Sequence, residues 1–368
     1  MGFYEKNQHL TSSKIFIFFC WIQAPSSNGS GHHSFKVKIG VRFPSGLFFI
    51  ANRLLINYTH TMRHSSIDIG SNSVLFTCIE EDGGIQIVKD VSVITGLSRG
   101  MEEAFKDDAI ERTVHAVCNF KEESKRIGCG VPVVIGTMAL RRAKNREVFL
   151  KRLKKACGLE VRILSGEEEG YYSFLSVSLG VKERIIVVDI GGGSTEIVSG
   201  AGRCVDYIRS IPIGAVSLYE RFIDSDPPSR DEVNKMLMFI EASLDDIQRP
   251  YGERVIGIGG TVTTLAAIHM GKEYSREDVE GIFLERRTIE KMIEMFMAKN
   301  SIERRIIKGM ENGREDIILA GTEILYTILN WAGFDGVYVS TRGVRYGVLM
   351  EKIEGGDYDT HIQKDKAT

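Results

Sequence analysis

The chain has 368 residues, 43% of them hydrophobic and 26% charged, and it carries a formal net charge of -2. This length leaves room for two domains of ordinary globular composition. A charge balance so close to neutral argues against a nucleic-acid-binding protein, whose affinity rests on a basic surface, so we expect no nucleic-acid partner. The six cysteines show no CxxC pair, which is typical of reduced thiols and favours a cytoplasmic location.

Residues 1–61 differ in residue pattern from the rest of the chain. The apolar run IFIFFCWI at 15–22 is too short to cross a bilayer, so we expect no membrane association. Because a strand is expected shortly after Met62, we interpret 1–61 as a non-native or disordered N-terminal extension. A genuine flexible tail and a targeting segment are the alternatives.

From Ser65 onward, strand-like and helix-like segments alternate, which indicates an α/β fold. In the first half we expect strands at 65–69, 73–79, 85–93, 131–136 and 161–164. A helix is expected at 101–127, with Gly128 behind it as a stop. A second is expected at 146–157, which Asn145 would cap and Gly158 would end.

The second half restarts the same scheme. Strands are expected at 184–190, 195–199, 204–210, 254–258 and 336–340, and helices at 231–248, 261–270, 288–298 and 315–332. We therefore predict an N-terminal domain at 62–183 and a C-terminal domain at 184–340, with the segment 341–368 packing back on the first domain.

Each half opens with a strand, a turn and a second strand, and the two turns are nearly identical. They read DIGSNS at 68–73 and DIGGGS at 189–194. Such an internal repeat predicts a duplicated domain whose two turns face each other across a cleft, where ligands prefer to bind. Two ordinary tight turns with solvated aspartates are the simpler alternative.

The residue types in these turns suit a phosphate and its cation. Glycines permit backbone angles that other residues avoid, so that successive N–H groups can converge on one anion. Asp68 and Asp189 would repel a phosphate, and we expect them to hold Mg²⁺ (or Mn²⁺) instead. The expected phosphate-binding residues of the two turns are Gly70, Ser71, Asn72, Ser73, Gly191, Gly192, Gly193, Ser194 and Thr195.

A third glycine cluster, GIGGTVTTLA at 257–266, reads as strand, turn and helix. Thr261 would cap the helix, and with Gly259 and Gly260 it would bind phosphate at the helix N-terminus. A simple connection between a strand and a helix is the alternative.

Two further stretches carry candidate catalytic side chains. In ILSGEEEGYY at 163–172, Ser165 and Glu168 fit a helix capping box. Glu169 points about 100° away from Glu168 around the helix and is a candidate general base, unless it is one more acidic first-turn residue. In the basic segment 136–155, a solvated helix face explains most of the basic residues, but Arg141 and Arg142 are expected in a loop, where a guanidinium group could bind phosphate.

Together these stretches resemble the exopolyphosphatase / guanosine pentaphosphate phosphohydrolase (Ppx/GppA) family of the actin, sugar kinase and heat-shock chaperone superfamily. The similar stretches are SIDIGSNSV (66–74), GTMALRRAKN (136–145), ILSGEEEG (163–170), VVDIGGGSTE (187–196), IPIGAVSLYE (211–220), GIGGTVTTLA (257–266) and VSTRGVRYGVL (339–349). The resemblance implies the short form of the family, with two ribonuclease-H-like α/β domains and an interdomain active-site cleft.

The resemblance also implies metal-dependent hydrolysis of a terminal phosphoanhydride, in inorganic polyphosphate or in guanosine pentaphosphate (pppGpp). It places the catalytic glutamate at Glu169, a phosphate-binding arginine at Arg141, and acidic metal and water positions at Asp189 and Glu196. The chain departs from the family pattern at Tyr171, Thr341 and Tyr346, where the family often has Arg, Asp and Glu, which leaves substrate preference open.

Two other functions stay open at this point. One is an ATP-dependent small-molecule kinase or ATPase of the same superfamily, and the other is a non-catalytic sensor that binds an alarmone or polyphosphate. The turns alone suit all three functions, whereas the stretches around Glu169 and Arg141 favour the hydrolase. A homodimer is one expected assembly.

Overall fold

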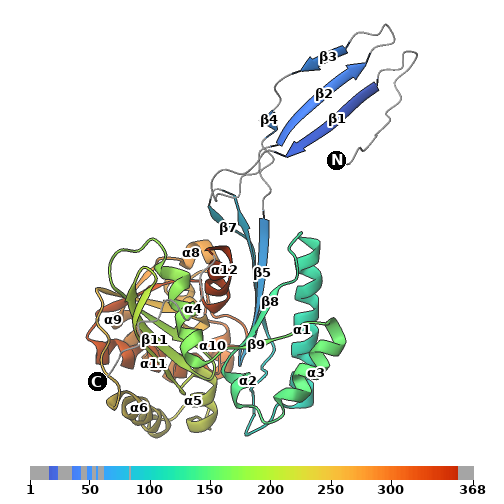
Figure 1. Cartoon of the computed structure of the whole chain (residues 1–368). Helices are drawn as coiled ribbons and strands as arrows, with labels where there is room; N and C mark the ends of the chain where they lie inside the picture. Colours follow the sequence, from blue (N-terminus) through green and yellow to red (C-terminus); the bar gives the residue numbers. More distant parts are fainter. Residues whose placement is uncertain are drawn as a thin grey trace, which may run out of the picture. The chain divides into compact units, whose positions relative to one another are not determined.

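The computed structural model of the chain describes residues 16–23, 35–42, 48–51, 55–56, 62–82 and 84–354, which belong to two compact units (Figure 1). One unit comprises Met1–Met62 with Glu80–Gln86, and the other comprises Arg63–Ile79 with Ile87–Thr368. The first unit holds a sheet in the order β1 (Phe16–Gln23), β2 (Phe35–Arg42) and β3 (Phe48–Ala51), with β4 (Leu55–Ile56) paired to β2. The interpretation of 1–61 as an extension stays a prediction, and much of that range lies outside the described residues.

Two sheets of matching topology organise the second unit. The first has the order β7 (Ile85–Ile94), β6 (Ser73–Glu81), β5 (Met62–Ile69), β8 (Val133–Gly136) and β9 (Arg162–Ile163). The second has the order β12 (Cys204–Ile211), β11 (Thr195–Ala201), β10 (Ile185–Ile190), β13 (Arg254–Ile258), β15 (Gly336–Val339) and β14 (Phe283–Glu285).

The two sheets also share their central register. β5 pairs in parallel with β8 so that Asp68 lies opposite Ile135, and β10 pairs in parallel with β13 so that Asp189 lies opposite Ile258. The repeat seen in the sequence is therefore a repeat of sheet topology, with an aspartate at the same place in each copy.

Helices cover these sheets, and most expected helices are present with shifted ends. The helices are α1 (Asp107–Arg126), α2 (Met138–Arg142), α3 (Arg146–Cys157), α4 (Gly166–Ser178), α5 (Ala215–Phe222), α6 (Arg230–Asp245), α7 (Gly260–Met270), α8 (Arg276–Val279), α9 (Arg286–Met297), α10 (Ser301–Arg305), α11 (Ile318–Ala332) and α12 (Val344–Glu354). Gly158 ends α3 in the left-handed conformation, as predicted. Among the described residues, no helix is both long and apolar enough to cross a membrane.

Three local predictions were wrong. Arg141 and Arg142 do not lie in a loop, because they form the last turn of α2. Asn145 does not cap α3 with its side chain, which instead bonds the backbone N–H and C=O of Phe105. Thr261 lies inside α7, whose N-cap is Gly259.

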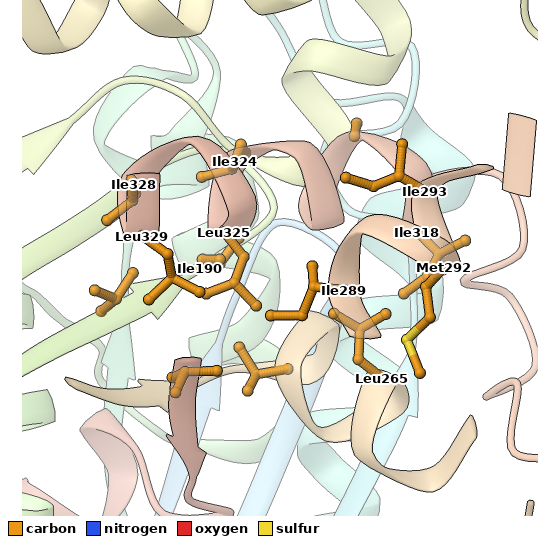
Figure 2. Close-up of a cluster of buried hydrophobic side chains, with 14 of the residues drawn as sticks. Ile190, Leu265, Ile289, Met292, Ile293, Ile318, Ile324, Leu325, Ile328 and Leu329 are labelled. Atoms are coloured by element: carbon orange, nitrogen blue, oxygen red, sulfur yellow. The ribbon is translucent and has the colours of Figure 1, made fainter. Parts of the chain in front are cut away.

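Alternation along the central strand of the second sheet separates two cores. Ile186, Val188 and Ile190 of β10 pack with helices α6, α7, α9 and α11, and part of this core is shown in Figure 2. Ile185 and Val187 point to the opposite face, where α4 and α12 pack. Asp189 shares that second face, since strand residues two apart point the same way.

The central strand of the first sheet follows the same rule. Ile67 and Ile69 of β5 pack in the core formed with α1 and α3. Ser66 points the other way and donates a hydrogen bond to the carbonyl of Arg345 in α12. Asp68 alternates with these isoleucines and therefore faces the same side as Ser66. Burying each isoleucine contributes about 1.5–3 kcal/mol, so the cores fix which way both aspartates point.

Candidate active site

A single pocket of the second unit collects most of the predicted site residues. Its lining includes Asp68, Gly70, Ser71, Asn72, Ser73, Glu169, Asp189, Gly191, Gly192, Gly193, Ser194, Gly259, Gly260 and Thr261. The remaining three predicted residues, Arg141, Thr195 and Glu196, do not line it. Both turns, the N-terminus of α7 and the candidate base thus meet at one place, although they come from distant parts of the sequence.

The two turns have the same internal geometry. The Gly70 N–H donates to the Ser73 carbonyl at 3.0 Å, and the Gly191 N–H donates to the Ser194 carbonyl at 2.9 Å. The repeated sequence DIGxxS therefore forms the same hydrogen-bonded turn in both places.

A backbone carbonyl group of each turn also accepts hydrogen bonds from a neighbouring segment. The Asn72 carbonyl accepts from the N–H of Thr95 and Gly96, and the Gly192 carbonyl accepts from the N–H of Val216 and Ser217 at the start of α5. In a trans peptide the C=O and the following N–H point in opposite directions. The N–H groups that follow these carbonyls, those of Ser73 and Gly193, are therefore directed away from the supporting segments, and both residues line the pocket.

Glycines are required in the second turn for a different reason from the one predicted. None of Gly70 and the triplet Gly191–Gly193 has a positive φ. Instead, a Cβ on Gly192 would lie 2.9 Å from the Cβ of Ser71, and a Cβ on Gly193 would lie 3.1 Å from the Ser71 Oγ. The two turns approach each other so closely that a Cβ at either position would require the Ser71 side chain to shift.

The N-terminus of α7 does need the conformational freedom of glycine. Gly259 has φ +97, and a Cβ there would lie 2.6 Å from the Ile190 carbonyl. The guanidinium group of Arg314 packs directly against Gly260, so a side chain at this position would have to displace it. An arginine therefore stands at the end of the helix where a phosphate would bind, a feature that the sequence did not indicate.

Four buried carboxyl groups lie in or next to the pocket, and the pKa of each is raised, chiefly by burial. Burial raises the pKa of Glu169 to about 8, with Asp68 and Asp189 adding to the effect and Arg141 opposing it. Burial raises the pKa of Asp68 to about 7, against the attraction of Arg345. The pKa of Asp189 is raised by burial, and that of Glu196 is raised well above its usual range by burial and by the charges of Glu169 and Asp189.

Several polar atoms in the first turn are buried without a hydrogen-bond partner in the structure. They are Asp68 Oδ1, Asn72 Oδ1 and Nδ2, and Ser73 Oγ. Buried polar groups are normally satisfied, so these atoms fit a site that is completed by a ligand.

A hard divalent cation fits this set of residues. A carboxylate oxygen without a partner is a ligand that Mg²⁺ prefers, and a cation would relieve the repulsion between Asp68, Asp189 and Glu169. Within the described residues, no group of three or more Asp, Glu, His or Cys side chains is placed to bind a metal together. Water and substrate phosphates would supply the other ligands, as they commonly do for Mg²⁺.

The two neighbouring glutamates of α4 have separate roles, as the helix geometry predicts. Glu168 completes a capping box with Ser165 and forms an ion pair with Arg162 at 2.6 Å. Glu169 is 7% exposed and accepts a hydrogen bond from Arg141 Nη1 at 2.7 Å. The same nitrogen of Arg141 donates to the Leu164 carbonyl, so the arginine orients the carboxylate from outside the pocket lining.

The other two predicted residues that do not line the pocket have partners of their own. Glu196 accepts a hydrogen bond from Ser210 Oγ at 2.7 Å, and Thr195 Oγ1 donates to the Ile213 carbonyl at 2.8 Å. Asp189 is held on the α4 face by a hydrogen bond from Ser173.

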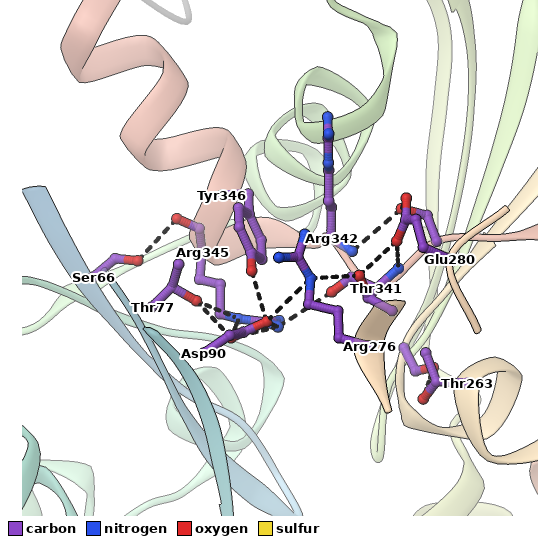
Figure 3. Close-up of polar contacts among 12 residues, drawn as sticks. Ser66, Thr77, Asp90, Thr263, Arg276, Glu280, Thr341, Arg342, Arg345 and Tyr346 are labelled. Carbon is purple, nitrogen blue, oxygen red and sulfur yellow. Dashed lines mark hydrogen bonds and ion pairs between the residues drawn. The ribbon is translucent and has the colours of Figure 1, made fainter. Parts of the chain in front are cut away.

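A second wall of the pocket carries residues that the sequence analysis did not single out as site residues (Figure 3). Arg345 Nη2 contacts both oxygens of Asp90 at 3.0 Å, and the Tyr346 hydroxyl donates to Asp90 Oδ2 at 2.6 Å. Thr341 accepts from Arg276 Nε at 2.9 Å and donates through its N–H to Glu280.

This network accounts for two of the three departures from the family pattern. Thr341 and Tyr346 are hydrogen-bonded parts of it. Tyr171 instead fills the core between the sheets, edge-on to Tyr172. The stretch VSTRGVRYGVL pointed to Arg345, but nothing local in the sequence pointed to Asp90.

The family profile and the solved structures that match this chain point to the same protein family. The profile of the Ppx/GppA phosphatase family matches residues 78–355. A bifunctional 3-dehydroquinate synthase/phosphatase of Fusobacterium nucleatum is 28% identical over 327 residues, covering 82% of this chain and 48% of that protein. A guanosine-5'-triphosphate,3'-diphosphate pyrophosphatase of Vibrio atlanticus is 25% identical over 300 residues, covering 79% of this chain and 59% of that protein. The chain thus spans about half the length of these two relatives.

Among solved structures, the Aquifex aeolicus member of the Ppx/GppA protein family is similar over nearly its whole length. It shares 36% sequence identity and a TM-score of 0.69, and the match covers 80% of this chain and 98% of the other. This likeness confirms the predicted fold class, an α/β fold with two repeated domains.

Proposed function

The chain belongs to the Ppx/GppA phosphatase family, and from this premise we propose that it hydrolyses the terminal phosphoanhydride of inorganic polyphosphate or guanosine pentaphosphate and releases orthophosphate. The observation that carries the proposal is the position of Glu169. Its buried carboxylate is oriented by Arg141 and lines the same pocket as two matched turns. A fixed carboxylate beside an anion-binding site is the arrangement that attack by water on phosphorus requires.

In the proposed reaction the turns position the substrate. The N–H groups of Ser73 and Gly193 and the N-terminus of α7 would bind the oxygens of the terminal phosphoryl group. These groups are fixed before the substrate arrives, so they stabilise the charge that develops during transfer without further reorganisation.

Glu169 would accept the proton of the attacking water. Arg141 keeps its carboxylate in one orientation through the 2.7 Å bond, and Arg141 is therefore proposed to act through Glu169. A pKa of about 8 lies close to neutral pH, where a general base works best.

Asp68 and Asp189 are proposed to hold Mg²⁺. When bound, this ion would neutralise part of the substrate's negative charge. Its presence would also favour the ionised form of Glu169, because a nearby positive charge lowers a carboxyl pKa.

The other wall of the pocket supports a substrate with several phosphates. Arg276, Arg314, Arg342 and Arg345 all line the pocket. Guanidinium groups bind phosphate oxygens well, but Arg345 is ion-paired with Asp90 and Arg314 with Glu311, so these two would have to exchange their carboxylate partners for phosphate. Polyphosphate and guanosine pentaphosphate both carry enough phosphate groups to contact more than one of the four arginines.

One side-by-side assay tests the proposal. The purified protein is incubated with Mg²⁺ and either polyphosphate, guanosine pentaphosphate, or ATP with a panel of sugars and small acids, while orthophosphate and phosphorylated products are measured. Orthophosphate release from one of the first two substrates is expected. Transfer from ATP to an acceptor would indicate the kinase, and tight binding without turnover would indicate the sensor, so either outcome would overturn the proposal.

A further inference from the structure

A pair of cysteines lies side by side in the core of the first sheet, away from the pocket. Cys78 is in β6, and Cys129 is in the loop between α1 and β8. Their Sγ atoms are 2.6 Å apart, and the two residues are 0% and 8% exposed. Covalent bonding distance is about 2.05 Å, so only a small shift separates this contact from a disulfide.

Hydrogen bonds hold the loop that contains Cys129 in place. The Cys129 N–H donates to the Ser124 carbonyl at 2.9 Å, and Ser124 Oγ donates to the Gly130 carbonyl at 3.0 Å. Ser124 Oγ also shares a hydrogen bond of 2.7 Å with Ser65 Oγ in β5. The loop is thus tied to the strand that neighbours β6 in the sheet, which keeps Cys129 next to Cys78.

We propose that Cys78 and Cys129 form a disulfide bond that links β6 covalently to the loop after α1. This departs from the expectation of reduced thiols, which rested on the spacing of the cysteines along the sequence. The two residues are 51 positions apart, and only the fold brings them together.

The bond would form during folding by exchange with a low-molecular-weight disulfide. One cysteine thiolate attacks that disulfide, forming a mixed disulfide and releasing one small thiol. The second cysteine thiolate then displaces the remaining half as a second thiol. The two protein thiols lose two electrons and two protons in total, and the small disulfide gains both. Once formed, the bond is enclosed in the core and shielded from reductants.

The consequence of the bond is greater stability without a change in the chemistry. A cross-link that closes a loop of this length limits the conformations of the unfolded chain, which stabilises the folded state. Neither cysteine lines the pocket. Reduction is therefore expected to lower the melting temperature by several degrees while leaving turnover at moderate temperature unchanged.

Mass spectrometry tests the bond directly. The protein is refolded with a glutathione redox couple, denatured without reductant, alkylated and digested with trypsin. We expect one cross-linked species joining the peptides 64–89 and 127–141, which reduction separates. Cys204 is exposed and serves as the control for complete alkylation. Alkylation of both Cys78 and Cys129 under these conditions would overturn the proposal.

Thermal unfolding of protein refolded either with the glutathione couple or with excess reductant gives a second test. The wild type and Cys204→Ala should melt at a lower temperature when reduced, whereas Cys129→Ala should melt at the same temperature in both conditions. If Cys129→Ala fails to fold, the alkylation result on the wild type decides alone. A shift on reduction that persists in a folded Cys129→Ala would show that another bond is responsible, and would overturn the proposal.

Discussion

Replacing Glu169 with glutamine removes one negative charge from the centre of the proposed site while keeping the shape of the side chain. In the structure the carboxylate accepts a hydrogen bond from Arg141 Nη1 at 2.7 Å. The amide oxygen of glutamine can accept the same bond, so the local geometry should persist. What glutamine cannot do is take a proton from water.

The size of the effect follows from the role proposed for this carboxylate. General base catalysis contributes about 10²- to 10⁴-fold, which corresponds to roughly 3–5 kcal/mol in the activation free energy. We expect Glu169→Gln to lower kcat by that factor. The binding of substrate through the turns should change little, because Glu169 is not one of the proposed phosphate ligands.

The assay is orthophosphate release at saturating substrate and Mg²⁺, with Glu168→Gln as the matched control. Glu168 is the adjacent residue of the same helix, and it caps α4 through Ser165. Glutamine also serves in a capping box, so this variant should keep kcat within about threefold of the wild type. Circular dichroism and melting temperature would confirm that both variants fold.

The pH profile adds a second readout. Because burial raises the pKa of Glu169 to about 8, the ionised fraction of this base grows as the pH rises. Because bound Mg²⁺ lowers this pKa, wild-type kcat/KM at saturating Mg²⁺ should increase with pH over a window below pH 8, and the profile of Glu169→Gln should be flat over that window. The mechanism is refuted if Glu169→Gln keeps more than a tenth of wild-type kcat, or if Glu168→Gln loses as much as Glu169→Gln.

Three further predictions concern the pocket. Because burial raises the pKa of Asp68 from 3.8 to about 7, the folded protein binds more protons than the unfolded chain between pH 3.8 and 7. The melting temperature without cation should therefore fall as the pH rises through that window, and an equally steep fall in Asp68→Asn would contradict this assignment. Chelation with EDTA should abolish phosphate release, and full turnover after chelation would exclude the metal requirement. Mg²⁺ should raise the melting temperature more at pH 8 than at pH 5. Gly192→Ala should lower kcat/KM and cost about 1–3 kcal/mol of stability, because its Cβ would lie 2.9 Å from the Cβ of Ser71. The control Gly130→Ala, whose Cβ would have no atom within 4 Å, should behave like the wild type. Equal stability of the two variants would show that the turns can move apart.

The sequence was most informative where function depends on a contiguous stretch. The two DIGxxS turns, the capping box of Ser165 and Glu168, and the strands around them could all be located from local residue patterns. Alternation within β5 and β10 then determines which way Asp68 and Asp189 point. These features depend on residues that are adjacent in the sequence, so the sequence alone is enough to predict them.

Features that depend on distant contacts could not be predicted in this way. A glycine needed for close approach looks the same in sequence as a glycine needed for a positive φ, so the reason for Gly192 became clear only from its distance to Ser71. Asp90 lies 255 positions before Arg345, and no local pattern connects them. The side-chain bonds of Asn145 likewise go to Phe105 rather than to the helix that it precedes.

The ion pair between Asp90 and Arg345 also sets an order of events during protein synthesis. The last strand of the first sheet, β9, ends at Ile163, but α12, which contacts Ser66 and Asp90 on the Asp68 side of that sheet, begins at Val344, about 180 residues later. At roughly 5–20 residues per second, the ribosome needs about 9–36 s to reach it. During that interval the nascent chain displays one uncovered face of its first sheet, a surface that a chaperone can occupy. The pocket is completed only after Arg345 has left the ribosome, so every strand of both sheets is synthesised before the site can work.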